Sequence, residues 1–241
     1  MKKVIILAAF AAMATASQAF LVYNNIPATG GYFTSSLRPK MIADDFDIAA
    51  VGANWPAQIN GLNLTYSTAA AGSFDILVDF FRDIDFSGTT SNIFGTQSPV
   101  ASYRVAINAS GAGLFQTGLM SLGAGFTLPA ISDYSLYNHG IRIRFVDTGT
   151  TTLSTSAANP TAAFQGNYPL TLGNSENVYW RDADNNGILS GSDARSFAAT
   201  GTATQANYAF QLGASAVPEP GTMAALGLGA VALIRRRRSS K

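Results

Sequence analysis

The sequence has 241 residues, of which 47% are hydrophobic and 12% are charged, and it contains no cysteine. The absence of cysteine excludes disulfides, thiolate nucleophiles and Cys-based metal sites, and the single histidine excludes a site built from several histidines of one chain. Positive charge gathers at the two ends, so that residues 4–217 contain eight Lys and Arg against thirteen Asp and Glu. An acidic body lacks the basic face that nucleic acids require, and we expect no nucleic-acid partner.

The first residues have the composition of a secretory signal peptide. Two lysines are followed by an apolar run from Val4 to Ala14, and small residues precede a cleavage position after Ala19. We predict that residues 1–19 form a signal peptide that is removed on export. The alternative is a retained anchor, for which the apolar run is short.

Residues 20–215 show the two-residue alternation of half-buried β-strands rather than helical periodicity. Apolar side chains occupy alternate positions in the segments 59–68, 74–86, 103–107, 141–145 and 208–212. Clusters of Gly, Asn, Ser and Pro separate these segments and are typical of turns, as at Gly111–Gly113 and Gly123–Gly125. Many short strands with such turns predict an all-β domain, an antiparallel, jelly-roll-like β-sandwich.

One predicted strand, from Phe74 to Phe86, has a row of acids opposite its apolar side chains. These acids are Asp75, Asp79, Asp83 and Asp85. The alternation predicts that they share a solvated face, with Phe80 and Ile84 on the other face. Carboxylates two residues apart lie ~7 Å apart along a strand, which suits an inverting glycosidase, so a secreted hydrolase that uses Asp83 and Asp85 is an alternative. Because no nucleophile elbow, phosphate loop or dinucleotide fingerprint occurs, we expect a non-enzymatic protein.

Residues 182–193 read DADNNGILSGSD and fit the twelve-position loop of an EF-hand. Ca²⁺ prefers oxygen ligands, and the predicted ones are Asp182, Asp184, Asn186, the backbone carbonyl of Ile188, Ser190 and Asp193. Gly187 permits the sharp turn, and we expect the side chain of Ile188 to pack inward. The final Asp in place of the usual Glu resembles dockerin-like extracellular loops and implies weak, structural calcium binding. The alternative is a polar surface turn without metal.

The last residues combine three features in a fixed order. Pro218, Glu219 and Pro220 precede an apolar run from Met223 to Ile234, and the cluster Arg235, Arg236, Arg237 and Arg238 follows. At 1.5 Å per residue the apolar run extends ~18 Å, short of a ~30 Å hydrocarbon core. The order of parts resembles the PEP-CTERM sorting signal of Gram-negative bacteria. The segment Ala43 to Phe46, Ala-Asp-Asp-Phe, is also similar to the start of many PEP-CTERM surface proteins, although the residues alone also suit an edge strand whose acids face solvent.

This resemblance implies a processing partner and a destination. Residues 216–241 would be a sorting tail with a short hydrophobic helix, which enters the inner membrane transiently and is processed by an exosortase. The protein would then reach the cell envelope, the cell surface or the extracellular matrix. A weak, retained membrane anchor is the alternative.

For the body of the chain we expect a structural or adhesive role in the extracellular polymer matrix. The main alternative is a carbohydrate-binding module that contacts polysaccharide through aromatic side chains. The candidates for such contacts are Trp55, Tyr134, Tyr137 and Trp180.

Overall fold

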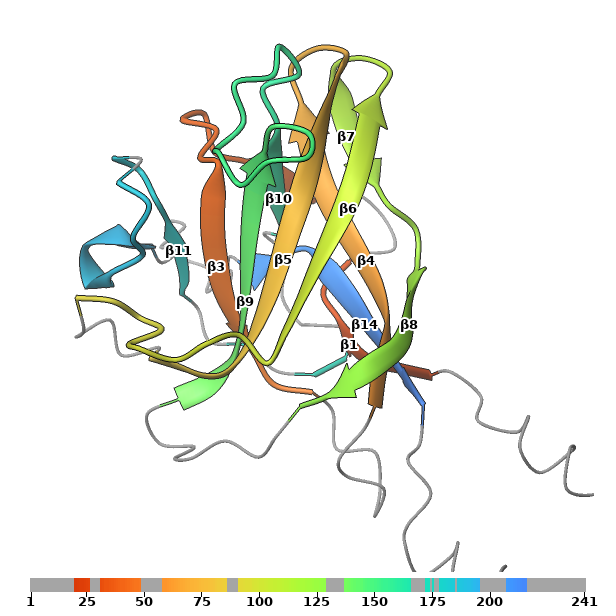
Figure 1. Cartoon of the computed structure of the whole chain (residues 1–241), viewed down its shortest axis with the longest axis vertical. Coiled ribbons are helices and arrows are strands. Elements are labelled where there is room, and N and C mark those ends of the chain that lie inside the picture. Colours follow the sequence, from red (N-terminus) through yellow and green to blue (C-terminus); the bar gives the residue numbers. More distant parts are fainter. Residues whose placement is uncertain are drawn as a thin grey trace, which may run out of the picture.

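The computed structural model describes residues 20–26, 31–48, 58–85, 91–128, 137–165, 172–173, 175, 178–184, 186–195 and 207–215. Two antiparallel sheets lie face to face in this part of the chain (Figure 1). The first, the β4 sheet, contains β1 (Phe20–Asn24), β2 (Tyr32–Thr34), β4 (Gln58–Thr68), β7 (Gly113–Gln116), β8 (Met120–Thr127), β10 (Thr161–Gln165), β13 (Asn207–Tyr208) and β14 (Phe210–Ser215). The second, the β5 sheet, has the order β12 (Ala194–Arg195), β11 (Tyr179–Arg181), β3 (Met41–Phe46), β9 (Tyr137–Val146), β5 (Gly72–Asp85) and β6 (Ala101–Ala109). The predicted antiparallel β-sandwich is therefore confirmed.

The main core lies between the two sheets and is rich in aromatic rings. Tyr23 stacks on Phe210 with ring centroids 4.4 Å apart, and Phe46 meets the edge of Phe210 at 5.5 Å. These rings come from β1, β14 and β3, so they join both sheets. Offset and edge-to-face ring pairs contribute stabilisation beyond the burial of their area.

Alternation predicted which side chains enter this core. Leu62, Leu64 and Tyr66 of β4 are buried in it, as are Ile141, Ile143 and Phe145 of β9 and Tyr208, Phe210 and Leu212. Half-buried Tyr103, Val105 and Ile107 pack against it from β6. The pattern is readable because each of these strands turns one face to the other sheet. By contrast, the predicted turn at Gly123–Gly125 lies within β8.

A second apolar cluster covers part of the outer face of the β5 sheet. It contains Met41, Ala43, Phe81, Ile84, Ile93, Phe94, Trp180 and Leu189. Its cover comes from the segments 91–95 and 188–190, which follow β5 and β11. As a result every residue of β3 is buried, and β3 pairs with β9 on one side and with β11 on the other. The reading of this segment as a solvent-facing edge strand was therefore wrong.

The regular alternation of β5 ends at a β-bulge. The register with β9 shifts between Phe81, which pairs with Gly140, and Ile84, which pairs with Asn138. Ile84 consequently packs in the outer cluster with Phe81, not in the main core with Phe80. A bulge inserts an extra residue and reverses the order of faces beyond it, which the two-residue pattern of the sequence does not reveal.

The first and last described strands lie side by side in the β4 sheet. Phe20 pairs with Ala214, and β14 is hydrogen-bonded on its other side to β4 from Leu64 to Gln58. Within the described residues no helix has the length and hydropathy that a membrane crossing requires. The predicted signal peptide and the predicted tail helix lie outside the described residues.

Candidate functional site

The predicted solvated row of acids is buried, which corrects the expectation from the sequence. Asp75, Asp79, Asp83 and Asp85 are each at most 8% exposed. They are covered by arginine side chains and by loops from elsewhere in the chain. Alternation correctly separates Asp75 and Asp79 from the main core, but polar residues on the outer face of a strand are solvated only where nothing covers that face.

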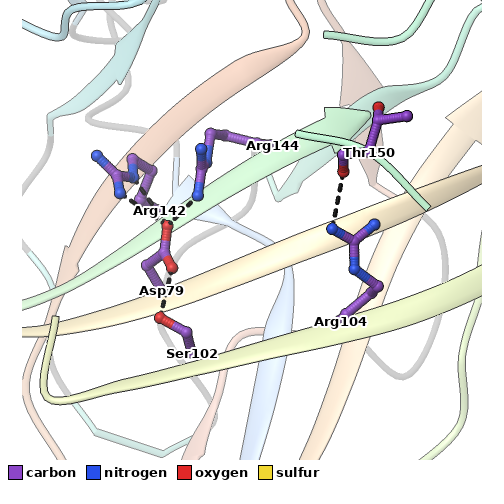
Figure 2. A network of polar contacts seen from close by, with 6 residues as sticks. All are labelled: Asp79, Ser102, Arg104, Arg142, Arg144 and Thr150. Carbon is purple, nitrogen blue, oxygen red and sulfur yellow. Dashed lines mark hydrogen bonds and ion pairs between the residues drawn. The ribbon is translucent and has the colours of Figure 1, made fainter. Parts of the chain in front are cut away.

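Asp79 is the centre of a cross-strand network on the outer face of the β5 sheet (Figure 2). Its Oδ2 accepts hydrogen bonds from Arg142 at 2.8 and 3.0 Å and from Arg144 at 3.0 Å, and its Oδ1 accepts one from Ser102 at 2.7 Å. β9 and β6 flank β5, so the three partners reach Asp79 from both sides. Burial raises the pKa of Asp79, but the bond from Ser102 and the two guanidinium groups outweigh burial and hold the pKa below its usual range.

Arg142 also contacts aromatic rings of the outer cluster. Its guanidinium lies 5.1 Å from the ring centroid of Phe81 and 5.2 Å from that of Phe94, within cation–π range. The two rings stack on each other with centroids 4.1 Å apart. Arg142 is therefore fixed by a carboxylate and by two rings, and the network joins the outer cluster to the charged part of the face.

Asp75, four residues from Asp79 along β5, is the centre of a second group of hydrogen bonds. Its Oδ2 accepts a hydrogen bond from Arg104 of β6 at 2.5 Å and one from the backbone N–H of Gly149 at 2.9 Å. Arg104 also donates to the carbonyl of Thr150 at 2.7 Å (Figure 2). Burial raises the pKa of Asp75, whereas the Gly149 N–H and Arg104 together bring it below its usual range. The loop after β9 is thus bound to β5 and β6 by one carboxylate.

Asp83 and Asp85 do not continue the row of Asp75 and Asp79, because Asp83 lies in the bulge and Asp85 follows it. Asp83 forms an ion pair with Arg82 at 2.8 Å, and its backbone N–H donates to the side chain of Gln97. The backbone N–H of Asp85 donates to the carbonyl of Ile93 at 3.1 Å. Both acids proposed for a glycosidase are therefore buried, and the backbone of each is bound to the segment that follows β5.

Two adjacent acids of β3, Asp44 and Asp45, are fully buried, although the residue pattern of this segment does not reveal it. Asp44 accepts hydrogen bonds from the backbone N–H of Tyr208 and, at 3.0 Å, from that of Asp45. Asp45 accepts one from Asn138 at 2.8 Å. Burial raises the pKa of Asp44 well above its usual range, and the neighbouring Asp45 raises it further, while the two N–H bonds offset only part of this rise.

The structure brings together the first half of the predicted calcium loop. Fully buried Asp182 accepts hydrogen bonds from the N–H of Asn186 and of Gly187, both at 3.0 Å. The side chain of Asn186 donates to Asp184 at 2.8 Å, and Gly187 has a φ of 78°, as the sharp turn requires. Burial raises the pKa of Asp182; the Gly187 N–H counteracts the rise and Asp184 adds to it.

The second half of the loop forms hydrogen bonds within itself. Asp193 accepts hydrogen bonds at 3.1 Å from the N–H and the hydroxyl of Ser190, and it ends a short 3-10 helix (Gly191–Asp193). The side chain of Ile188 is 51% exposed, so the expectation that it packs inward was wrong. Leu189 is buried in its place, in the outer cluster. Among the described side chains no three His, Asp or Glu come together as a group that could hold a metal ion.

Of the four aromatic residues predicted to contact polysaccharide, only Trp180 has a side chain that the structure describes. Trp180 is completely buried in the outer cluster and is not available to a ligand. Tyr137 begins β9, but its side chain is not described, and Trp55 and Tyr134 lie outside the described residues.

The predicted sorting residues, Pro218 to Pro220 and Arg235 to Arg238, also lie outside the described residues. Comparison with protein families identifies a PEP-CTERM protein-sorting motif at residues 216–238, which includes all of them. No curated protein and no solved structure matches the chain. The motif implies recognition by an exosortase. The chain is thus an exported protein of the cell surface or extracellular space, with a PEP-CTERM sorting signal that follows a β-sandwich.

Proposed function

We propose that this protein is a non-enzymatic, structural or adhesive component of the cell envelope or extracellular polymer matrix. The observation that carries the proposal is that the acids on the outer face of the β5 sheet are already bound by arginines. Asp75 and Asp79 are bound by Arg104, Arg142 and Arg144 of the same chain. Carboxylates and arginines used in this way join strands and loops, which is what a rigid surface domain needs.

The buried acids also argue against the glycosidase alternative. Glycoside hydrolysis requires two carboxyl groups on either side of a bound sugar, one of them able to give a proton to the leaving group. Asp83 is paired with Arg82, and both Asp83 and Asp85 are at most 8% exposed. Neither residue is therefore open to a sugar ring.

The proposal is tested by the cohesion of the matrix around cells that contain an exosortase. We expect replacement of Pro218, Glu219 and Pro220 by alanine to remove the protein from the surface and to lower the yield stress of the matrix. Thr222→Ala, next to the motif, serves as the control and leaves cohesion unchanged. Unchanged cohesion in the triple variant would contradict the structural role.

The two alternative functions have outcomes of their own. Saturable binding of purified polysaccharide without an effect on cohesion would assign a carbohydrate-binding module. Release of reducing sugar that is lost in Asp83→Asn would assign a hydrolase.

We also propose that the loop 182–193 binds Ca²⁺ as a structural ion. Support comes from the first half of the loop, where the carboxylates of Asp182 and Asp184 both accept hydrogen bonds from Asn186 and so lie on the same turn. These are the hard oxygen ligands that Ca²⁺ prefers. Since Asp193 is engaged by Ser190 in this structure, we expect weak affinity, in the range of about 10⁻⁴–10⁻³ M typical of extracellular modules.

For this loop we expect 10 mM Ca²⁺ to stabilise the exported protein by about 1.4 kcal/mol if the dissociation constant is about 1 mM. This corresponds to a rise in Tm of roughly 3–6 °C for a chain of this size. Asp184→Asn removes an exposed ligand, leaves in place the backbone N–H bonds to the buried Asp182, and should abolish most of the rise. Ser192→Ala is the matched control in the same loop. Equal shifts with Mg²⁺, or an unchanged shift in Asp184→Asn, would contradict calcium binding.

A further inference from the structure

The edges of the two sheets differ in how well they are protected from pairing with another chain. Among the described strands β12 and β13 have two residues each, and β1 has an irregular register with β14. β8 contains Gly123 and Gly125 at φ values of 66° and 69°, and its register with β4 shifts. Short, bulged and twisted edges are the usual means by which β-proteins avoid edge-to-edge association.

β6 has none of these protections. It pairs with β5 over nine consecutive residues, from Ala101 opposite Phe80 to Ala109 opposite Gly72, without a shift in register. It contains neither Pro nor Gly. In the described part of the chain β6 pairs with β5 alone. In an antiparallel strand alternate residues turn their N–H and C=O groups away from the paired neighbour, so β6 presents a regular row of such groups at the outer edge of the sheet (Figure 1).

The one charge on β6 does not protect this edge. Charged side chains often block edge strands, but Arg104 is bound to Asp75 on β5 and to the Thr150 carbonyl after β9. Its guanidinium is therefore held over the inner strands of the sheet and does not project beyond the outer edge of β6 (Figure 2).

We propose that β6 pairs in antiparallel fashion with β6 of a second copy of this chain, about a two-fold axis at Val105. A two-fold interface is formed by the same patch on both copies, so its register must be self-complementary. Centred at Val105, all nine residues pair. Tyr103 then meets Ile107 of the second copy, and Arg104 meets Ala106. A register centred at Arg104 would oppose two like charges and would leave the last two residues without partners, and like charges directly opposite are destabilising.

This register also matches the exposure of the side chains. Tyr103, Val105 and Ile107 are half-buried and lie on the side of the main core, whereas Ser102 and Ala106 are exposed on the other side. In the dimer the half-buried apolar side chains cover one another along the open edge of the sandwich. The β5 sheets of the two copies become one continuous sheet. The pairing does not depend on the matrix role or on calcium.

Single cysteines in the exported protein test the register directly, because the chain has no cysteine of its own. Directly opposed residues of antiparallel strands have Cα atoms about 4.5–5.5 Å apart, within disulfide range. We therefore expect Val105→Cys to form a covalent dimer under mild oxidation by diamide. Ile107→Cys is the matched control: its two copies would lie ~13 Å apart and should not be joined. Equal rates of cross-linking for the two variants, or none for Val105→Cys, would overturn the proposal.

Charge substitution at the same strand tests the energetics in solution. In sedimentation velocity experiments we expect a concentration-dependent dimer. Ala106→Arg places a positive charge opposite Arg104 of the second copy at two symmetric positions, and should raise the dimer dissociation constant at least tenfold. Ala106→Glu should lower it, and Ala112→Arg, in the exposed turn after β6, should leave it unchanged. A monomer at all concentrations, or equal effects of both arginine variants, would refute pairing through β6.

Discussion

Asp79→Ala is expected to lower the free energy of unfolding by about 3 kcal/mol, the range found when one partner of a buried ion pair is removed. The side chain of Asp79 is 5% exposed, and those of Arg142 and Arg144 are 24% and 25% exposed. Without the carboxylate, two guanidinium groups remain close together with little access to water. The loss is measured by urea unfolding of the exported protein at pH 7.

Ser102→Ala provides the graded control for this network, because it removes one neutral donor and leaves both ion pairs intact. We expect it to cost about 1 kcal/mol. If Asp79→Ala costs no more than Ser102→Ala, then the arginines are adequately solvated, and the network has the small value of surface ion pairs.

The pH dependence of the Asp79 contribution follows from its lowered pKa. The folded protein holds the ionised form, so the stabilisation is fully present above the carboxyl pKa of the unfolded chain, about 4, and is lost as the pH falls through the lower pKa of the folded state. We expect unfolding curves of the wild type and of Asp79→Ala to converge towards pH 3. A constant difference from pH 7 to pH 3 would mean that the pKa of Asp79 is not shifted.

Asp44 is expected to make the free energy of unfolding fall as the pH rises, which is the opposite of the effect of Asp79. Asp44→Asn should remove this fall. The pKa of Asp44 is raised, so the folded state keeps a proton that the unfolded chain releases above pH ~4. Raising the pH therefore favours unfolding, by up to about 1.4 kcal/mol per pH unit, until the raised pKa of the folded state is passed. Asparagine has the shape of the protonated acid but does not titrate.

For Asp44 the quantity to compare is the change in the free energy of unfolding with pH, not its value at a single pH. The amide of Asn accepts through one oxygen only, so the variant loses a hydrogen bond at every pH, at a cost of about 1 kcal/mol. We expect this variant to be less stable than the wild type at pH 4 and to gain relative to it as the pH rises to 8. Asp147→Asn, which changes a half-buried acid outside β3, is the control. Parallel curves for Asp44→Asn and the wild type would contradict a raised pKa.

The features that the sequence predicts well are local. Leu62, Leu64 and Tyr66 reveal their strand because one face of β4 is buried, and alternation records this directly. The sorting tail is recognisable because its motif, apolar run and arginine cluster follow one another in the chain. The match of the sorting motif to residues 216–238 confirms that interpretation.

The features that the sequence does not predict depend on contacts between distant segments. From the sequence Asp75 looks like a solvated residue. In the structure it accepts a hydrogen bond from the N–H of Gly149, which lies 74 residues further along the chain. Asp44 has the same appearance until the N–H of Tyr208 reaches it from β13. The bulge before Ile84 belongs to the same class, because the pairing with β9, and not the sequence of β5 itself, decides where the alternation breaks.

The position of β14 decides how the domain responds to mechanical load. Any pull applied through the sorting tail enters the sandwich at Ser215, the last residue of β14. β14 lies between β1 and β4 and is hydrogen-bonded to both of them. Because these bonds run perpendicular to the strand, a force along its axis shears both ladders at once and does not open them one bond at a time. The attachment point therefore coincides with a part of the sheet that is arranged to resist extraction of the strand.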